Sequence, residues 1–363
     1  MSGSWSGSSR SLEFLIPGDL QAATGGYAYD RRIAEQLVGL GWRVRLHALD
    51  ASFPLPTVAA LAHARDTLQR LDDHALVLID GLALGAMPAV VAEQASRLRL
   101  VGLVHHPLAA ETGLADAAAE TLRRSERSAL ATLQAVVVTS RRTLRDLAGY
   151  GVAVERMSVV EPGTDPPAVR MTAAADSAAS ADTSVLRLLC VATLVPRKGH
   201  RLLLQALAAL REMHWTLDCV GSTTRNAVEA QAIALLISTL RLTDRVRCRG
   251  ELDADALAMA YRDADVFVLA THHEGYGMAV GEAIANGLPV VSTRVGAIPT
   301  IVGETAGLLV PPGDAAALTA ALSTVISNPA RRAELAQGAR QRAATLPTWA
   351  EAGRQFDAAL RRL

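Results

Sequence analysis

Residues 266–293 read VFVLATHHEGYGMAVGEAIANGLPVVST. The apolar run Val266 to Ala270 predicts a buried strand. The end of the following loop and the residues through Ala283 to Asn286 have the composition of a helix. Gly287 predicts the helix C-cap, because glycine readily adopts the left-handed conformation that ends a helix, and Pro289 introduces a second strand, Val290 to Thr293. This order of strand, loop, helix and strand is one unit of a parallel α/β sheet.

Two carboxylates, Glu274 and Glu282, bracket the glycine-rich loop of this unit. Gly275 and Gly277 remove side chains where the backbone turns, so the N–H groups up to Met278 can approach a ligand closely. A helix N-terminus offers unpaired donors and a partial positive charge, and a diphosphate would fit there. Glu282, about one turn into the helix, can accept hydrogen bonds from vicinal hydroxyls such as those of a ribose. The alternative is that Glu282 only complements the helix dipole and Glu274 is a solvated loop residue.

The same alternation of strands and helices extends along the whole chain. Apolar runs separated by helix-length stretches predict two sets of parallel strands, 12–16, 44–48, 76–80, 100–105, 135–139 and 157–161, then 186–192, 216–221, 246–250, 266–270, 290–293 and 307–310. Between the sets, residues 166–184 are mostly Ala, Ser, Asp, Thr and Pro without periodicity, which predicts a linker. We therefore expect two doubly wound α/β domains with ligands at the carboxyl ends of their strands.

Composition disfavours several functional classes. The chain has 36 basic and 36 acidic residues and no long basic run, so no nucleic-acid partner is expected. The first ten residues are rich in Ser and Gly, and no segment reaches the roughly 18 apolar residues of a membrane span, so a cytoplasmic protein is expected. Cys190, Cys219 and Cys248 are far apart in the sequence and are predicted to be buried structural thiols rather than metal ligands or disulfides.

Other candidate residues also follow predicted strands. Gly25 and Gly26 precede a helix expected near Tyr27, and His105 and His106 end the fourth strand, where one of them is expected to face a ligand. Arg197-Lys198 lies at the first turn of the second domain, where two cations could neutralise phosphate oxygens or could simply be solvated. Micromolar binding requires about 8 kcal/mol, whereas a helix N-terminus contributes at most about 2, so a bound diphosphate needs these cations.

Together these motifs resemble glycosyltransferase family 4, the group 1 family of retaining glycosyltransferases with the GT-B architecture. The resemblance rests on Gly25-Gly26, the histidine after the fourth strand, Glu161-Pro162-Gly163-Thr164-Asp165, Arg197-Lys198-Gly199, Ala264-Asp265-Val266 and the run from Glu274 to Glu282, which is similar to the family's E-x7-E motif. It implies two Rossmann-like domains that face a central cleft. The expected bounds are 1–165 for the acceptor-side domain, 166–185 for a linker and 186–346 for the nucleotide-sugar domain. A final helix is expected over 347–363, where it could pack back on the first domain.

The resemblance also implies roles for residues of the second domain. Glu282 would bind the ribose of a nucleotide diphosphate sugar, and Glu274 would contact the donor sugar near its anomeric carbon. Lys198, assisted by Arg197, would hold the diphosphate and stabilise it as the leaving group. The backbone of Gly275, Tyr276, Gly277 and Met278 would line the donor sugar and its phosphates.

In the first domain, Gly25 and Gly26 would cap the diphosphate, and His105 would hydrogen-bond the transferred sugar, with His106 left open as the alternative. One position departs from the family pattern, because Thr193 stands where an arginine usually lies five residues before the lysine. Arg197 is expected to supply that charge; otherwise diphosphate binding should be weaker than in relatives. No metal and no other cofactor is expected, since no Asp-x-Asp cluster follows a strand that borders the cleft.

The implied reaction is transfer of a sugar from a UDP- or GDP-sugar, with retention of anomeric configuration, to an acceptor such as a glycan, a lipid or a small metabolite. The alternatives are a sugar-nucleotide epimerase of the same architecture and a non-catalytic nucleotide-sugar-binding protein. A dehydrogenase is disfavoured, because the Gly-x-Gly-x-x-Gly fingerprint is absent. Residues 121–133 carry three arginines among apolar residues and could contact the inner face of a membrane, although a solvated helix face is favoured.

Overall fold

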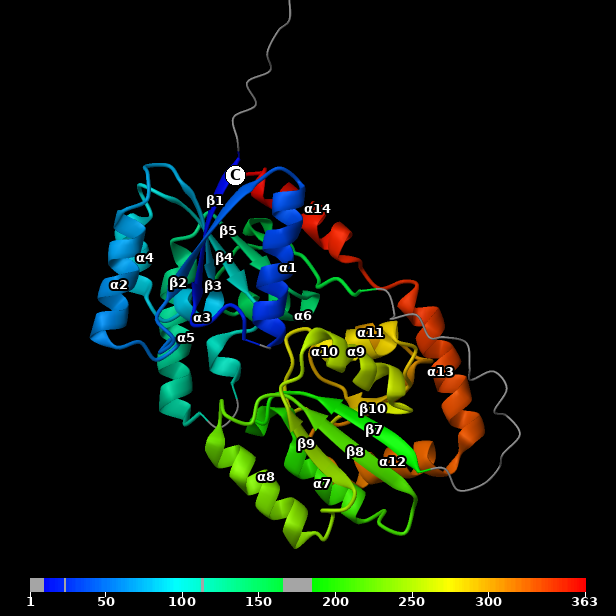
Figure 1. Cartoon of the computed structure of the whole chain (residues 1–363). Helices are drawn as coiled ribbons and strands as arrows, with labels where there is room; N and C mark the ends of the chain where they lie inside the picture. Colours follow the sequence, from blue (N-terminus) through cyan, green and yellow to red (C-terminus); the bar gives the residue numbers. More distant parts are fainter. Residues whose placement is uncertain (1–9, 23, 112–113, 166–184) are drawn as a thin grey trace, which may run out of the picture. The chain divides into compact units, whose positions relative to one another are not determined.

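The computed structural model describes residues 10–22, 24–111, 114–165 and 185–363 (Figure 1). The chain divides into two compact units, residues 1–163 together with 347–363, and residues 164–346. The expected linker therefore lies almost entirely outside the described residues. The first unit ends two residues before the expected domain boundary, and the C-terminal segment 347–363 belongs to it.

The first unit contains one parallel six-stranded sheet in the order β2-β1-β3-β4-β5-β6. Its strands are β1 (Ser11–Pro17), β2 (Arg43–Leu49), β3 (Leu76–Asp80), β4 (Arg99–Val104), β5 (Ala135–Val138) and β6 (Met157–Val159). The intervening helices are α1 (Gly25–Gly39), α2 (Val58–Gln69), α3 (Gly81–Leu84), α4 (Pro88–Gln94), α5 (Asp116–Ala131) and α6 (Arg141–Ala148), with 3-10 turns η1 (Leu108–Ala110) and η2 (Val154–Arg156). The central strands β3 and β4 are buried except at Arg99, as expected for a sheet covered on both faces.

The C-terminal helix α14 (Trp349–Leu360) packs on α1 within this unit. The contact is close, because a Cβ atom added at Gly353 would lie 2.5 Å from Cβ of Gln36. Trp349 stacks at a tilt against Tyr29 with ring centroids 6.0 Å apart. Asp357 accepts a hydrogen bond of 2.7 Å from Nε1 of Trp42. Helix α14 is thus joined to α1 by apolar contacts and to Trp42, just beyond α1, by a hydrogen bond.

The second unit contains a parallel sheet in the order β12-β11-β10-β7-β8-β9. Its strands are β7 (Leu186–Val191), β8 (Trp215–Val220), β9 (Val246–Gly250), β10 (Val266–Leu269), β11 (Val290–Thr293) and β12 (Gly307–Val310). Its helices are α7 (His200–Ala208), α8 (Ala227–Thr239), α9 (Ala254–Asp263), α10 (Met278–Ala285), α11 (Ile298–Val302), α12 (Ala315–Ser327) and α13 (Pro329–Ala343), with the 3-10 turn η3 (Pro196–Lys198). Both units are thus Rossmann-like, and all twelve predicted strands are confirmed to within two residues at their ends.

The segment 266–293 folds as its sequence predicts. Helix α10 ends in a Schellman motif, in which the N–H of Gly287 donates to the carbonyl of Ile284 and that of Leu288 to Ala283. Gly287 has a φ of +72°, the left-handed conformation expected of it. The helix begins at Met278 with Gly277 as its N-cap, so Gly275 and Tyr276 precede it.

The prediction of three buried thiols is wrong for one of them. Cys190 and Cys219 are buried, whereas Cys248 is exposed. The reason is the strand order, which leaves β9 at the edge of the second sheet. Among the residues that the structure describes, no helix is long and apolar enough to cross a membrane.

Candidate functional site

The strand order of the second unit brings two predicted motifs to one point. The sheet reverses its direction of growth between β7 and β10, which are hydrogen-bonded neighbours. Ligands of doubly wound sheets bind beside the carboxyl ends of the strands at such a switch point. Arg197 and Lys198 follow β7, and Glu274 follows β10, so the strand order places the cations and the carboxylate together.

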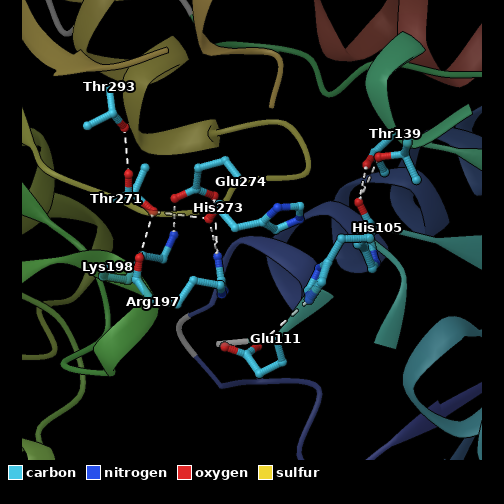
Figure 2. A network of polar contacts seen from close by, with 11 residues as sticks. His105, Glu111, Thr139, Arg197, Lys198, Thr271, His273, Glu274 and Thr293 are labelled. Atoms are coloured by element: carbon cyan, nitrogen blue, oxygen red, sulfur yellow. Dashed lines mark hydrogen bonds and ion pairs between the residues drawn. The ribbon is translucent and has the colours of Figure 1, made fainter. Parts of the chain in front are cut away.

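Two ion pairs join Lys198 and Arg197 to Glu274, as Figure 2 shows. Nζ of Lys198 donates to Oε1 of Glu274 at 2.5 Å. Nη1 of Arg197 lies 3.7 Å from Oε2 of Glu274 and donates to the backbone carbonyl of His273 at 2.8 Å. The side chains are 18%, 14% and 7% exposed for Lys198, Arg197 and Glu274. Two cations against one carboxylate leave a net positive charge on the cluster, which suits an anionic ligand.

Buried hydroxyl groups hold the two loops of this cluster together. Oγ1 of Thr271 donates to the carbonyl of Arg197, and Oγ1 of Thr293 donates to the carbonyl of Thr271 at 2.6 Å (Figure 2). Glycines allow the close approach of the backbones. A Cβ atom at Gly199 would lie 1.9 Å from the carbonyl oxygen of Ala270, and one at Gly296 would lie equally close to that of Glu274. The ion pairs are therefore carried by closely packed, hydrogen-bonded backbone segments.

The two helices that start at this switch point share an unusual N-terminus. Both α7 and α10 have a left-handed glycine as N-cap, Gly199 and Gly277, and neither has a side-chain cap hydrogen bond among the described residues. By contrast, α8, α9 and α12 of the same unit are capped by an Asn or Asp side chain. The N-terminal donors of α7 and α10 are thus left without a competing side-chain acceptor, which favours an external anion.

Glu282 is half-buried on α10 and is held by a residue from a different helix. Oε2 of Glu282 accepts a hydrogen bond of 2.7 Å from the hydroxyl of Tyr261, which is itself buried on α9. Burial raises the pKa of Glu282, while the bond from Tyr261 lowers it and the charge of Asp165 raises it. In the described part of the chain Oε1 has no recorded hydrogen bond, so this oxygen remains available to a ligand hydroxyl.

Thr193 lies just beyond β7 and supplies no charge to the cluster. Its backbone makes a close approach to the next strand, because a Cβ atom at Gly221 would lie 2.8 Å from the nitrogen of Thr193. Arg197 and Lys198 are the cations that contact Glu274 in the described residues. That Arg197 supplies the charge of the absent arginine stays a prediction.

In the first unit, the predicted glycine pair and His105 are in contact. Helix α1 begins at Gly25, two residues before the expected start, and Thr24 accepts a hydrogen bond from the N–H of Tyr27 as its N-cap. A Cβ atom at Gly26 would lie 3.6 Å from Cδ2 of His105, so glycine leaves the imidazole room beside the helix. The carbonyl of His105 accepts hydrogen bonds from the hydroxyls of Thr139 and Thr143 (Figure 2).

Two buried carboxylates fix the charge of His105. Its Nε2 lies 3.1 Å from Oδ1 of Asp30 and 3.4 Å from Oδ2 of Asp80. Burial of the imidazole lowers its pKa, but Asp30 and then Asp80 outweigh burial and raise the pKa of His105 to about 10. His105 is therefore an imidazolium at neutral pH. In the described residues these three side chains are also the one group whose ligand atoms lie close enough together to hold a metal ion.

His106 has a different environment. Its Nε2 lies 3.8 Å from Oε2 of Glu111 in the following loop, and its side chain is as exposed as that of His105. The position of His105 beside Gly26 and two buried carboxylates favours His105 for the predicted role.

Three residues of these clusters escaped the sequence analysis. Tyr261 lies on a helix whose sequence carries no motif, and its importance depends on the packing of α9 beside α10. Asp30 lies one turn into α1, and Asp80 ends β3 and caps α3. The position of Asp80 at a strand end was a usable signal, but nothing in the sequence indicated that Asp30 and Asp80 share one partner.

Comparison with known proteins identifies the family and the fold of the chain. Residues 25–167 match the model for Glycosyltransferase Family 4, and residues 186–328 match that for Glycosyl transferases group 1, which together span most of the chain. A D-inositol 3-phosphate glycosyltransferase of Kineococcus radiotolerans is 34% identical over 224 residues, which cover 56% of this chain and 51% of the relative. The match thus spans about half of that relative's length.

Two solved structures have the same fold over nearly their whole length. Sucrose-phosphate synthase from Thermosynechococcus elongatus superposes with a TM-score of 0.81 at 23% identity and covers 97% of this chain and 98% of its own. The Anabaena protein HepE in complex with UDP and glucose superposes with a TM-score of 0.73 at 19% identity, over 98% and 100% of the two chains. The chain therefore belongs to the group 1 glycosyltransferases of family 4, and its two Rossmann-like units are those of the GT-B fold.

Proposed function

We propose that the protein transfers a sugar from a nucleotide diphosphate sugar to an acceptor hydroxyl, with retention of the anomeric configuration. The observation that carries the proposal is the cluster of Lys198, Arg197 and Glu274 at the switch point of the second sheet. It joins a net positive charge to two helix N-termini that lack side-chain caps in the described residues. Such a site suits a diphosphate that gains negative charge as it departs.

In the proposed reaction, the bond between the anomeric carbon and the diphosphate oxygen breaks, and a bond from that carbon to the acceptor oxygen forms on the same face. The departing oxygen takes the proton of the acceptor hydroxyl. Lys198 and Arg197 stabilise the charge on the diphosphate, and Glu274 holds both cations in place until the diphosphate shares them. Catalysis then depends mainly on positioning and electrostatic stabilisation, and the side chains supply no nucleophile.

Glu282 is proposed to bind the ribose. Tyr261 fixes one carboxylate oxygen at 2.7 Å, and the other can accept a hydrogen bond from a ribose hydroxyl. A carboxylate anchored in this way loses little conformational freedom when it binds, which favours affinity. UDP-sugars are the first donors to test, because the similar HepE structure contains UDP and glucose. GDP-sugars remain the second class.

The imidazolium of His105 is proposed to hydrogen-bond the donor sugar. Gly25 and Gly26, which open the helix that carries Asp30, are proposed to approach the phosphates. The acceptor is unidentified, and the matched Kineococcus radiotolerans relative makes D-inositol 3-phosphate the first acceptor to test.

The first experiment is calorimetric titration of UDP, GDP and their common sugars into the purified full-length protein, in buffer with EDTA. Saturable binding of one nucleotide class is expected, and Glu282→Ala should weaken it. Glu304→Ala removes an exposed carboxylate elsewhere in the same unit and serves as the matched control. Binding that requires a divalent cation, or that survives Glu282→Ala unchanged, would contradict the proposed donor site.

The second experiment measures transfer from the identified donor to a panel of acceptors, with product stereochemistry read by NMR. Retention of the anomeric configuration is expected, and Lys198→Ala should lower turnover by about two to three orders of magnitude, as for loss of one oxyanion donor. Conversion of the donor sugar without acceptor would indicate the epimerase instead. Tight donor binding with neither conversion nor hydrolysis under any condition would indicate the non-catalytic binding protein.

A further inference from the structure

The three cysteines, far apart in the sequence, form a row across the second sheet. Cys190 on β7 is paired in register with Cys219 on β8, and Cys219 is paired with Cys248 on β9. These strands lie side by side at one end of the sheet (Figure 1). Paired residues of neighbouring parallel strands project from the same face, so the Cys219 thiol lies between the other two and interacts with both.

The row runs from the interior of the unit to its surface. Cys190 and Cys219 are buried and Cys248 is exposed on the edge strand. At the inner end, Sγ of Cys190 lies 3.8 Å from Nε2 of His200, a buried residue of α7. An oxidant from solution can therefore reach Cys248 first, and the nearest sulfur behind it is that of Cys219.

The backbone geometry is compatible with a covalent bridge between the outer two thiols. Neighbouring strands lie about 4.7–4.9 Å apart, inside the range of about 4.4–6.8 Å that Cα atoms span in disulfides. The bridge also has room to adjust, because β9 is hydrogen-bonded on one side only and the register of β8 and β9 shifts directly after the pair.

The electrostatic environment distinguishes the two thiols, because the interaction that lowers the pKa of Cys248 raises the pKa of Cys219 above its ordinary value. Interaction with the Cys219 thiol lowers the pKa of Cys248 to about 7, against the opposing effect of burial. A large fraction of Cys248 is then thiolate at physiological pH, and the thiolate is the form that attacks disulfides.

We propose that Cys248 and Cys219 form a redox modification site, in which Cys248 reacts with a low-molecular-weight disulfide and Cys219 resolves the product. The Cys248 thiolate attacks one sulfur of the small disulfide, forms a mixed disulfide and releases one small thiol. Cys219 then attacks the Cys248 sulfur, forms the bond between the two strands and releases the second small thiol. Two protein thiols are oxidised, and the small disulfide is reduced to two thiols.

The site is independent of the proposed transferase activity. Neither Cys248 nor Cys219 contacts Lys198, Glu274 or Glu282 in the recorded hydrogen bonds and ion pairs of the described residues. The bridge would fix the edge strand β9 to its neighbour.

The test uses the reduced full-length protein and oxidised glutathione at pH 7.5, with free thiols alkylated and peptides identified by mass spectrometry. The expected product retains no glutathione and contains a disulfide-linked peptide pair that joins Cys219 to Cys248. Of the three thiols, the one at Cys190 should remain free and be alkylated. Cys219→Ser should trap glutathione on Cys248, Cys248→Ser should prevent the bridge, and Cys190→Ser should still form it.

Several results would overturn the proposal. These are glutathione retained on Cys248 of the wild-type protein, a dimer linked through Cys248, a link between Cys190 and Cys219, or no reaction of Cys248. The wild-type product decides the matter by itself, so a variant that fails to fold does not remove the test.

Discussion

The ion pair between Lys198 and Glu274 gives a quantitative prediction. Replacement Lys198→Met removes the charge while keeping most of the side-chain volume, and it leaves the carboxylate of Glu274, 6% exposed as a residue, with Arg197 at 3.7 Å. Breaking a buried pair by removing one partner costs about 3–5 kcal/mol. Because Arg197 remains near, we expect a loss at the lower end, about 3 kcal/mol, which corresponds to a fall in Tm of roughly 6–12 °C for a domain of this size.

Calorimetric unfolding of the wild type, the single variant and the double variant Lys198→Met/Glu274→Gln measures this loss. The double variant removes both charges of this pair but leaves Arg197 without the carboxylate, so we expect it to recover part of the stability and none of the proposed turnover. Arg187→Met is the matched control, because Arg187 on β7 pairs with Asp265 at 3.3 Å in the same unit, and its side chain is 58% exposed. Such exposed pairs contribute about 0–1 kcal/mol.

The reasoning fails if Lys198→Met unfolds at the wild-type temperature, since the ion pair would then contribute nothing in solution. It also fails if the double variant is less stable than the single variant. A further refutation is a loss for Arg187→Met equal to that for Lys198→Met, because burial would not then be the source of the effect.

Three further predictions follow from the clusters. Tyr261→Phe removes the hydroxyl that hydrogen-bonds Glu282 and raises the pKa of Glu282 further. The affinity for the nucleotide sugar should therefore fall about tenfold at neutral pH and more at pH 6, as measured by calorimetric titration at both pH values. The pKa of His105 is raised from its usual 6.5 to about 10, so the stabilisation by its charged form is complete below pH 6.5 and is lost as the pH rises to 10. The free energy of unfolding should therefore decrease between pH 6.5 and 10, by up to about 1.4 kcal/mol per pH unit. Urea unfolding of His105→Gln should show a weaker dependence of this free energy on pH. Gly199 and Gly250 both have a φ of +70°, but a Cβ atom at Gly199 would clash with the carbonyl of Ala270, whereas one at Gly250 would meet open space. In urea unfolding, Gly250→Ala should lower the free energy of unfolding by about 1–2 kcal/mol, and Gly199→Ala should lower it clearly more. Equal losses of stability would show that the clash is relieved at no cost.

The sequence by itself determined the secondary structure and the motif that carries the proposed chemistry. Strand and helix periodicity is local, and a parallel sheet covered on both faces leaves continuous apolar runs, so all twelve strands could be located from their residues. Gly287 ended α10 as predicted, because a left-handed C-cap favours glycine at that position alone. Glu274 and Lys198 could be selected because they follow strands, where doubly wound folds present side chains to ligands, and Glu282 because it lies in the first turns of the helix after the same glycine-rich loop.

Only the tertiary structure decided which of these residues share a partner. The reversal of strand order between β7 and β10 joins Lys198 to Glu274, and packing of α9 beside α10 joins Tyr261 to Glu282. Asp30 and Asp80 meet at His105 from separate elements, so the imidazolium depends on contacts that no local pattern encodes. The cysteines look isolated in the sequence, yet adjacent strands bring them into one row, and the edge position of β9 exposes Cys248. The physical reason is common to all four cases: periodicity records which face of an element is buried, whereas strand order and helix packing select its neighbours.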